Sequence, residues 1–348
     1  MDHSKVMDFL GQVVTDLGAA GAAGLTAIGS RLGLYSALAQ GPATPEQLAE
    51  RTGCHPRYLT EWLRGQAAGG YISYDSGSEQ FFLTDEQQFC LADPNGPNLP
   101  AASLIILGYL RAEPQIAEAF RSGEGFGWHQ HDENVFVGCD AFYRPGYVAE
   151  LVPNWIPALD GVEAKLTAGG RVADVGCGLG SSSILLAEAF PNSSIVGSDY
   201  HAESIELAAK KAAEAGVIDR VRFEVSSAQM FAGENYDLVT MFDCLHDMGD
   251  PLGAARRVRE ALAPDGTWLL VEPFASDNVE ENFNPVGRLY YAGSTFLCVP
   301  NGMSQPGGYA LGAQAGAAPI RQVAADAGFT RFRQVAATPF NLVYEIRP

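Results

Sequence analysis

Short apolar runs and helical patterns alternate along the second half of the chain, from Gly169 onward. The runs are rich in Val, Ile and Leu, and the stretches between them repeat their apolar residues at helical spacing. Alternation at these lengths predicts an α/β fold with a largely parallel, doubly wound, Rossmann-like sheet. The pattern predicts strands at residues 171–175, 194–199, 220–225, 236–243, 267–273, 330–336 and 340–346. It predicts helices near 182–190, 202–215, 252–262 and 317–327.

The last two predicted strands are separated only by a short turn at Thr338-Pro339. A turn this short joins antiparallel neighbours, so the final pair should close a seven-stranded sheet with its last strand antiparallel. A long insertion at about 274–319 precedes them and is rich in Tyr, Phe, Gly and Asn. Insertions of this length inside a compact domain tend to be functional. We expect this one to act as a lid.

The N-terminal pattern, from Val6 to Ala39, is helical but contains glycines at 18, 21, 24 and 29. Each glycine would destabilise an isolated helix by about 1 kcal/mol. Another helix that packs closely against this one would explain these glycines. That second helix belongs either to a partner subunit or to the same chain.

Residues 31–91 predict three helices followed by a hairpin. A helix at 31–40 is followed by one that Thr44 caps, with Gln47 completing a capping box, and by a third that starts at His55-Pro56. The hairpin pairs residues 71–74 with 80–83. Three helices and a hairpin form a winged helix. From Asn98 to Ala164 the pattern is helical again, with a break near 122–127. We therefore expect an N-terminal domain at 1–97, a helical connector contributing to a substrate pocket at 98–165, and a catalytic domain at 166–348.

The formal net charge of −19 argues against a general affinity for nucleic acid or anionic membranes. Winged helices often bind DNA, but residues 31–91 carry four Arg and seven Asp or Glu, a balance of 4 − 7 = −3. A DNA-binding surface is normally basic. Dimerisation or a substrate-lid role is the favoured reading of this domain.

The six cysteines are scattered and include no Cys-x-x-Cys pair, so neither a disulfide framework nor a zinc site is indicated. His129 and His131 lack a second pair of ligands at a familiar spacing, and no metal is expected. The N-terminus lacks the basic segment and the following apolar segment that are typical of a signal peptide. The weakly polar stretch 17–30 is shorter than the ~20 residues that span a bilayer. We expect a cytoplasmic protein.

The first predicted strand runs into a glycine-rich turn, from Asp174 through Gly176 and Gly178 to Gly180, after which a helix begins. A phosphate loop requires Lys after its last glycine, and this turn has none. A dinucleotide-binding fingerprint requires glycine at the position where this chain has Ser181. Asp199 ends the second strand, where a carboxylate can accept two hydrogen bonds from ribose hydroxyls. A small-molecule pocket is expected at the carboxyl ends of these strands.

These segments resemble the class I S-adenosylmethionine-dependent methyltransferases. The resemblance rests on residues 174–180, on Asp199 and on Tyr236 to Val239 in the fourth strand, and it covers about 165–348. The winged helix extends it to small-molecule methyltransferases with an N-terminal dimerisation domain. These include plant-type O-methyltransferases and bacterial relatives that act on secondary metabolites. The resemblance implies a homodimer formed through the N-terminal domain.

The resemblance also implies the binding site for S-adenosyl-L-methionine and its product, S-adenosyl-L-homocysteine. The glycines would line the methionine half, Asp199 would hold the ribose, and Tyr200 would lie against the adenine. Ala228 and Gln229 match a segment that flanks the adenine, and Phe242 and Asp243 would border the sulfonium. The expected cofactor-binding residues are Asp174, Gly176, Cys177, Gly178, Gly180, Asp199, Tyr200, Ala228, Gln229, Phe242 and Asp243.

His246 directly follows the fourth strand, and its ordinary pKa of about 6.5 suits proton abstraction near neutrality. The pair His246-Asp247 matches the plant-type family, whose His is the general base, and Glu272 falls where that family has an acid that orients it. The family's second acid would fall near residue 306, but residues 304–308 contain none. Either Glu272 suffices or the acceptor is not a phenol. His246 is alternatively a polar residue without a catalytic role.

The sequence thus predicts methyl transfer to a small acceptor, with the hydroxyl of an aromatic or polycyclic metabolite favoured. Carbon or nitrogen methylation by proximity is the alternative within the same fold. A cofactor-sensing DNA-binding regulator and a non-methylating protein with the same pocket are alternatives of a different class. The residues expected around the acceptor are Trp128, His129, Tyr143, Tyr147, Tyr290, Tyr291 and Phe296.

Overall fold

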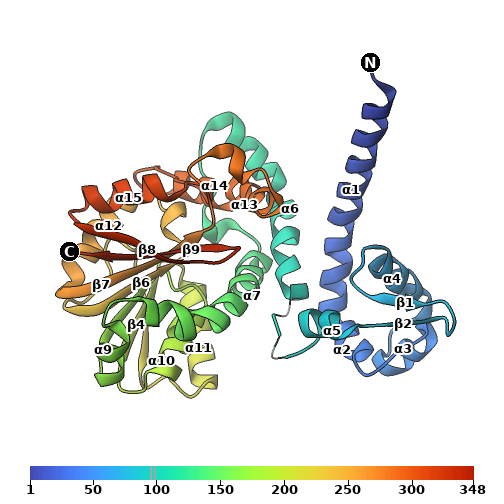
Figure 1. Cartoon of the computed structure of the whole chain (residues 1–348), viewed down its shortest axis with the longest axis horizontal. Coiled ribbons are helices and arrows are strands. Elements are labelled where there is room, and N and C mark those ends of the chain that lie inside the picture. The colour runs from blue at the N-terminus through green and yellow to red at the C-terminus, as the bar shows by residue number, and fades with distance from the viewer. Residues whose placement is uncertain (95, 98) are drawn as a thin grey trace. The chain divides into compact units, whose positions relative to one another are not determined.

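A computed structural model describes residues 1–94, 96–97 and 99–348 of the chain (Figure 1). These residues form two compact units. The first unit comprises Met1–Leu110 and Glu133–Pro145, and the second comprises Arg111–Asp132 and Gly146–Pro348. The expected three-part division of the chain stays a prediction, and its first boundary falls at Asn98, outside the described residues.

The first unit contains the expected winged helix. The capping box predicted at the start of α3 is present, because Thr44 accepts a hydrogen bond from the Gln47 amide and the Gln47 side chain accepts one from the Thr44 amide. Trp62 and Leu63 of α4 are buried in the core of this unit. Its elements after α1 are α2 (Leu34–Leu38), α3 (Pro45–Thr52), α4 (Pro56–Ala68), the antiparallel strands β1 (Ser73–Asp75) and β2 (Gln80–Phe82), and α5 (Asp85–Leu91).

Helix α1 (His3–Arg31) differs from the prediction at both ends. It begins at His3 because the Asp2 side chain caps it by accepting a hydrogen bond from the Ser4 amide at 3.0 Å. It ends at Arg31, and the helix expected at 31–40 is present as a separate and shorter element. Gly33 adopts a left-handed conformation, with a φ of 64°, and starts the separate helix α2.

The glycines of α1 have two kinds of surroundings. A Cβ atom at Gly29 would lie 2.5 Å from the Trp62 ring, so this glycine allows α4 to pack closely. Nothing lies within 4 Å of the corresponding positions at Gly18, Gly21 and Gly24. Packing within this chain therefore accounts for Gly29 alone among these four.

Among the described residues, α1 is the one helix long and apolar enough to cross a membrane. An 18-residue window has a mean hydropathy of 1.2, and 17% of that window is buried. The expectation that this region is too short to span a bilayer considered only residues 17–30, and the helix is 29 residues long. Length and composition alone are weak grounds for a membrane span.

A seven-stranded sheet forms the centre of the second unit, as predicted (Figure 1). Its spatial order is β5-β4-β3-β6-β7-β9-β8. The first five of these strands pair in parallel, whereas β9 is antiparallel to both β7 and β8. The strands are β3 (Arg171–Val175), β4 (Ser194–Asp199), β5 (Val221–Val225), β6 (Tyr236–Phe242), β7 (Leu262–Pro273), β8 (Arg331–Ala337) and β9 (Asn341–Arg347).

Helices α12 (Pro251–Ala261) and α15 (Ala317–Asp326) pack on one face of this sheet. They share a buried cluster with apolar residues of β3, β6, β7 and β9. Parallel strands between helical layers read as near-continuous apolar runs, which is why their positions could be predicted from sequence. The helices that follow β3 and β4 are α10 (Ser181–Ala189) and α11 (Ala202–Glu214).

The segments that precede β3 are helical, as expected. Both α6 and α7 contain residues of the two units. The segments are α6 (Leu99–Ser122), the 3₁₀ helix η1 (Trp128–Gln130), α7 (Glu133–Glu150), the π-helical turn η2 (Leu151–Trp155), α8 (Ile156–Ala158) and α9 (Val162–Ala168).

The insertion after β7 is largely helical rather than an extended loop. Its apolar residues lie on short helices, which the sequence analysis did not predict. The elements are η4 (Val279–Asn282), α13 (Pro285–Gly293), the π-helical turn η5 (Ser294–Cys298) and α14 (Val299–Ser304). Asn301 of α14 bonds to the backbone of Asp247, so the insertion borders the carboxyl end of β6.

Candidate active site

Three glycines shape the turn between β3 and α10. Gly176, Gly178 and Gly180 have φ angles of 73°, 51° and 78°, which side chains other than glycine rarely adopt. A Cβ atom added at Gly176 would lie 2.7 Å from Cys244 Sγ, and one added at Gly180 would lie 2.8 Å from the Phe223 ring. A Cβ atom added at Gly178 would have no other atom within 4 Å. Two of the glycines therefore permit close internal packing, and Gly178 faces open space.

Asp174 supports this turn from inside and is fully buried. Its carboxylate accepts hydrogen bonds from the hydroxyls of Ser182 and Ser183, at 2.6 Å each, and of Thr240, at 2.8 Å. Burial raises the pKa of Asp174, and these three hydroxyl groups oppose the rise. The bonds tie the end of β3 to the first turn of α10. Cys177 is also buried, and burial raises the pKa of its thiol well above the usual value.

Asp199 ends β4 beside the glycine turn. Its Oδ2 accepts a hydrogen bond from the Gly178 amide at 3.0 Å, and its Oδ1 accepts one from the His201 amide at 2.9 Å. Burial raises the pKa of this carboxyl, and the two amides oppose the rise. Each oxygen can still accept a further donor. The open space at Gly178 and this acceptor pair fit an adenosyl ligand with two ribose hydroxyls.

The residues expected near the adenine follow β4 and β5, which are neighbours in the sheet. Tyr200 comes directly after β4, is 41% exposed, and donates its hydroxyl hydrogen bond to Asn301 Oδ1 at 3.0 Å. Ala228 packs against the core of the sheet. Gln229 donates to the backbone oxygen of Asp250 at 3.0 Å. These residues therefore border the same edge of the sheet.

Asp243 follows β6 in a left-handed conformation, with a φ of 50°. Its carboxylate accepts hydrogen bonds from the Tyr147 hydroxyl and from Asn341 Nδ2, each at 2.8 Å. Burial raises the pKa of Asp243 to about 8, although the Tyr147 hydroxyl opposes the rise. The preceding Phe242 is buried, and its ring centre lies 5.1 Å from that of Tyr147. Tyr147 thus contacts both residues expected beside the sulfonium.

His246 and Glu272 form a buried pair at the carboxyl ends of β6 and β7. His246 lies in the 3₁₀ helix η3 (Leu245–Asp247) and is 3% exposed, and Glu272 is 1% exposed. His246 Nδ1 lies 2.6 Å from Glu272 Oε2, and the Leu245 amide donates to Glu272 Oε1 at 3.0 Å. The carboxylate therefore fixes the orientation of the imidazole ring.

The charges around this pair have opposing effects. Burial by itself lowers the pKa of His246, but the Glu272 carboxylate, together with Cys298, outweighs burial and raises that pKa well above its ordinary value. Burial raises the pKa of the neighbouring Asp247 to about 7, and His246 opposes this rise. The Glu272 carboxylate therefore favours the protonated form of the imidazole.

Cys298 contacts the other ring nitrogen and was missed by the sequence analysis. Its Sγ lies 3.3 Å from His246 Nε2. Cys298 is buried at the end of η5, a π-helical turn, and such turns are frequent at functional sites. No spacing pattern connects residues 246 and 298, so no sequence signal could have found this contact.

The residues expected around an acceptor occupy different environments. Tyr147 and Tyr290 are buried, and the Tyr290 hydroxyl donates to the backbone oxygen of Phe340 at 2.7 Å. Trp128 is half-buried, and its amide donates to Asn301 Oδ1 at 3.0 Å. His129 is exposed. Tyr147 directly contacts the residues expected beside the sulfonium.

Two further members of that set are Tyr143 and Tyr291. Tyr143 belongs to the first unit, where its ring centre is 5.0 Å from that of Phe142. Its position relative to the site in the second unit is therefore undefined. Tyr291 is half-buried on α13.

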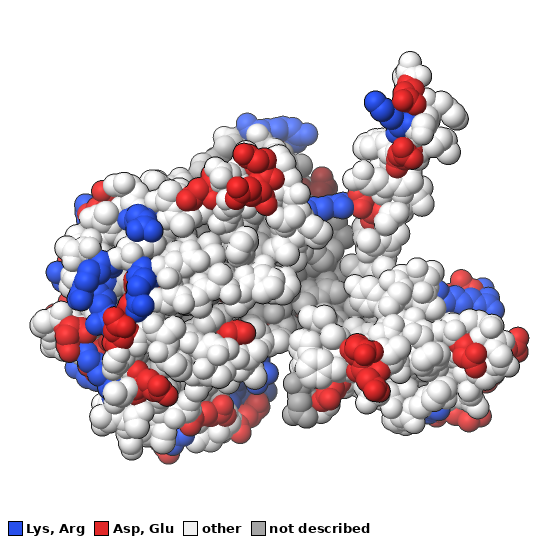
Figure 2. Space-filling view, in the orientation of Figure 1, with Lys and Arg blue, Asp and Glu red and all other residues white. Residues whose placement is uncertain are grey.

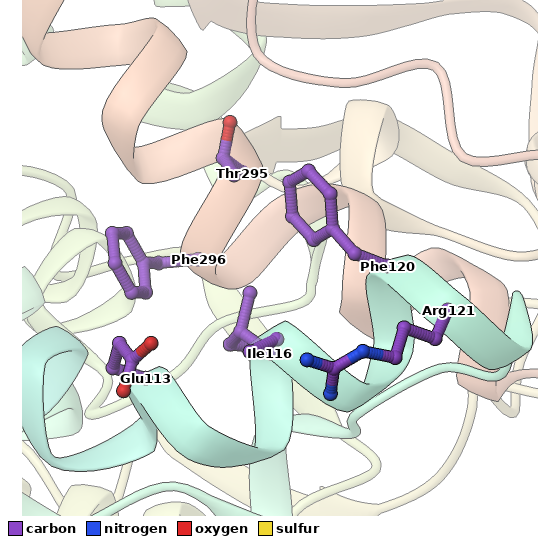
Figure 3. Close-up of a pocket in the computed structure, with 7 residues that line it drawn as sticks. Glu113, Ile116, Phe120, Arg121, Thr295 and Phe296 are labelled. Carbon is purple, nitrogen blue, oxygen red and sulfur yellow. The ribbon is translucent and has the colours of Figure 1, made fainter.

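Phe296, the last member, lines an open groove on the second unit (Figure 3). The groove has a volume of about 440 Å³ and lies between the C-terminal half of α6 and η5. Cys298, two residues further on, contacts His246 instead, and residues two apart on a helix do not share a face. The groove and the base therefore lie on different sides of η5. The lining residues are Glu113, Ile116, Ala117, Phe120, Arg121, Thr295 and Phe296.

Two family models match the chain: "Methyltransferase domain" at residues 166–299 and "Rv2258c-like winged HTH domain" at 20–93. The O-methyltransferase SfmM3 of Streptomyces lavendulae is 26% identical over 263 residues, which are 71% of this chain and 75% of SfmM3. The uncharacterized methyltransferase YcgJ of Bacillus subtilis strain 168 is 31% identical over 130 residues, which are 36% of this chain and half of YcgJ. The structure of the mitomycin 7-O-methyltransferase MmcR matches both chains over their full length, with 19% identity and a TM-score of 0.71.

The strand order, the glycine turn after β3 and the acid that ends β4 define the class I methyltransferase fold. The chain contains a methyltransferase domain at residues 166–299 and an N-terminal winged-helix domain at residues 20–93. Its methyl donor is S-adenosylmethionine.

Proposed function

We propose that the protein transfers a methyl group from S-adenosylmethionine to a hydroxyl of a small aromatic or polycyclic acceptor, with His246 as general base. The observation that carries this proposal is the 2.6 Å contact between His246 Nδ1 and Glu272 Oε2, one strand away from the glycine turn. Both SfmM3 and MmcR are named O-methyltransferases, which supports an oxygen acceptor.

Residues at the carboxyl ends of β3 and β4 hold the donor in this proposal. Gly178 leaves room for the ligand to approach the backbone, and Asp199 accepts hydrogen bonds from the ribose hydroxyls. The donor supplies a methyl group on a sulfonium with its own leaving group. The protein therefore contributes mainly orientation, an effect that can be worth about 7–11 kcal/mol.

His246 supplies proton transfer through its Nε2 atom. Glu272 occupies Nδ1, so Nε2 is the nitrogen that can take a proton from an acceptor hydroxyl. The imidazolium that results is stabilised by the carboxylate, as in other carboxylate-oriented bases. Cys298 must yield its position at Nε2 for the hydroxyl to approach. Tyr147 and Phe242 supply aromatic surface beside Asp243.

The first unit serves as a dimerisation domain in this proposal, and its partner is a second copy of the chain. Apolar side chains on α1 are exposed, and Figure 2 shows uncharged residues between the charged ones along its visible face. The glycines at 18, 21 and 24 would let the backbone of another helix come close. The large exposed apolar residues of α1 are Met7, Phe9, Leu10, Val13, Val14, Leu17 and Ile28.

The test is turnover of methyl-labelled S-adenosylmethionine with a panel of phenols, naphthols and polycyclic hydroxylated compounds, followed by mass spectrometry and NMR of the products. We expect O-methyl products from a subset of the panel. Products methylated only at carbon or nitrogen would contradict the oxygen acceptor.

Carbon or nitrogen methylation is the second candidate, and one observation favours it. The thiol of Cys298 lies against Nε2, where an acceptor hydroxyl would need access. An activated carbon or an amine needs less help from a base. A His246→Ala variant with unchanged turnover on such an acceptor would favour this candidate.

A further inference from the structure

Asn301 joins three separate segments of the second unit through one buried side chain. It lies in α14 and is 2% exposed. Its Oδ1 accepts hydrogen bonds from the Tyr200 hydroxyl and from the Trp128 amide, each at 3.0 Å. Its Nδ2 donates to the backbone oxygen of Asp247 at 3.2 Å.

Each partner belongs to a different part of the proposed site. Tyr200 follows Asp199 on the donor side, and Asp247 follows His246 on the side of the base. Trp128 begins η1 within the segment Gly125–His131, which we call the strap. One carboxamide therefore connects the donor side, the turn that carries the base, and the strap.

The strap is docked on α14 by further contacts. The Phe126 amide donates to the backbone oxygen of Pro300 at 2.9 Å. A Cβ atom at Gly125 would lie 2.0 Å from the Ser304 amide nitrogen, so the two backbones touch. Movement of α14 consequently moves the strap.

Burial makes the Asn301 carboxamide hard to replace. Asn301 is buried and hydrogen-bonds to three groups, so its removal would leave each of them without this partner. Both lone pairs of Oδ1 are in use, one for the donor side and one for the strap. A ligand that fixes the Tyr200 ring therefore also fixes the acceptor of the Trp128 amide.

We propose that Asn301 is a positioning residue that couples occupation of the donor site at Tyr200 to ordering of the strap. The inference rests on the proposed donor site. Such coupling is reciprocal, and its usual size is about 5- to 150-fold in affinity. An ordered strap would in turn favour binding of the acceptor, because Trp128 lies on it.

The experiment measures hydrogen exchange of peptides that cover 124–131, with and without S-adenosylhomocysteine. The wild type should show slower exchange of the Trp128 amide when the ligand is bound. Tyr200→Phe removes a single hydroxyl, and Asn301→Ala removes the carboxamide that joins this hydroxyl to the Trp128 amide. Both variants should lose the ligand-dependent slowing and retain measurable ligand binding by calorimetry.

Gln305→Ala is the matched control. Gln305 donates to the same Asp247 oxygen at 3.3 Å and accepts from the Gly249 amide at 3.2 Å, but it has no hydrogen bond to Tyr200 or the strap. This variant should keep the ligand-dependent slowing. If Asn301→Ala fails to fold, as judged by circular dichroism, Tyr200→Phe carries the test.

The outcomes separate this inference from the proposed function. A wild type that binds no S-adenosylhomocysteine would contradict the donor site itself. Binding without any change in strap exchange would overturn only the coupling. Unaltered slowing in Tyr200→Phe would also overturn it.

Discussion

Each carboxylate oxygen of Asp199 accepts one backbone amide, which fixes the orientation of the group. The remaining lone pairs can accept ribose hydroxyls. Hydrogen bonds to charged groups contribute about 1.5–3 kcal/mol each. Asp199→Ala should therefore weaken S-adenosylhomocysteine binding by roughly 10²-fold or more, measured by calorimetry. Asp199→Asn keeps the shape and should lose less, and unchanged affinity in Asp199→Ala would remove the ribose assignment.

The buried pair of His246 and Glu272 predicts how activity depends on pH. The base must be deprotonated, and Glu272 raises the pKa of His246, so kcat should rise with pH through a midpoint above about 6.5. Glu272→Gln should move this midpoint to lower pH. The other titratable groups around His246 are Cys298, Asp243 and Asp247. A pH–rate profile of both proteins checks this, and an unshifted midpoint in Glu272→Gln would contradict it.

The same pair predicts the sign of a stability effect. The folded pKa of His246 lies above its unfolded value, so the folded state binds the proton more tightly. The stabilisation is fully present below about pH 6.5 and is lost as pH rises through the folded pKa. The protein should therefore lose this contribution under the alkaline conditions that favour catalysis.

At the scale of elements, the turn after β3 offers a matched pair of substitutions. Gly178→Ala adds a methyl group to open space, whereas Gly180→Ala would press one against Phe223. Both incur about 1–2 kcal/mol of left-handed strain. Gly180→Ala should lower the free energy of unfolding further, by about 1–3 kcal/mol of overpacking. Gly178→Ala should instead mainly weaken S-adenosylhomocysteine binding.

Denaturant unfolding and calorimetry on the two variants separate these effects. Binding by Gly178→Ala with wild-type affinity would show that the ligand does not approach this glycine. Equal stability of the two variants would contradict the packing role of Gly180.

Local signals explain why most elements could be predicted. The strands β3 and β4 begin and end where the apolar runs do. The residues Thr44 and Gln47 predict the capping box that the structure has at the start of α3. The end of α1 could not be placed, because the helical pattern continues past Gly33 and only its backbone conformation breaks the helix. The helices of the insertion were missed because aromatic and glycine-rich segments carry weak helical periodicity.

The candidate site was predictable where a strand end positions a residue. Asp199, His246 and Glu272 follow or end parallel strands of the same sheet, so the topology alone brings them to one edge of the sheet. Cys298 and Asn301 lie on short helices of the insertion, whose packing depends on the folded chain. Their contacts with His246 and Tyr200 therefore left no pattern in the sequence.

At the scale of the whole molecule, the exposed apolar surface of α1 predicts self-association. Leu10 and Val14 are exposed, lie four residues apart on one face of the helix, and would be buried in a dimer. Light scattering after size-exclusion chromatography should give a dimer for the wild type. The double variant Leu10→Asp/Val14→Asp should be shifted toward monomer, with its circular dichroism unchanged. A monomeric wild type would contradict the dimer.

The most direct test of the account is the turnover of His246→Ala on an acceptor hydroxyl. A general base contributes about 10²- to 10⁴-fold, so kcat should fall by that factor while S-adenosylhomocysteine affinity stays within a few-fold of wild type. His3→Ala changes an exposed histidine at the start of α1 and serves as control. Wild-type turnover in His246→Ala, with the donor bound normally, would contradict the claim that this buried histidine takes the proton.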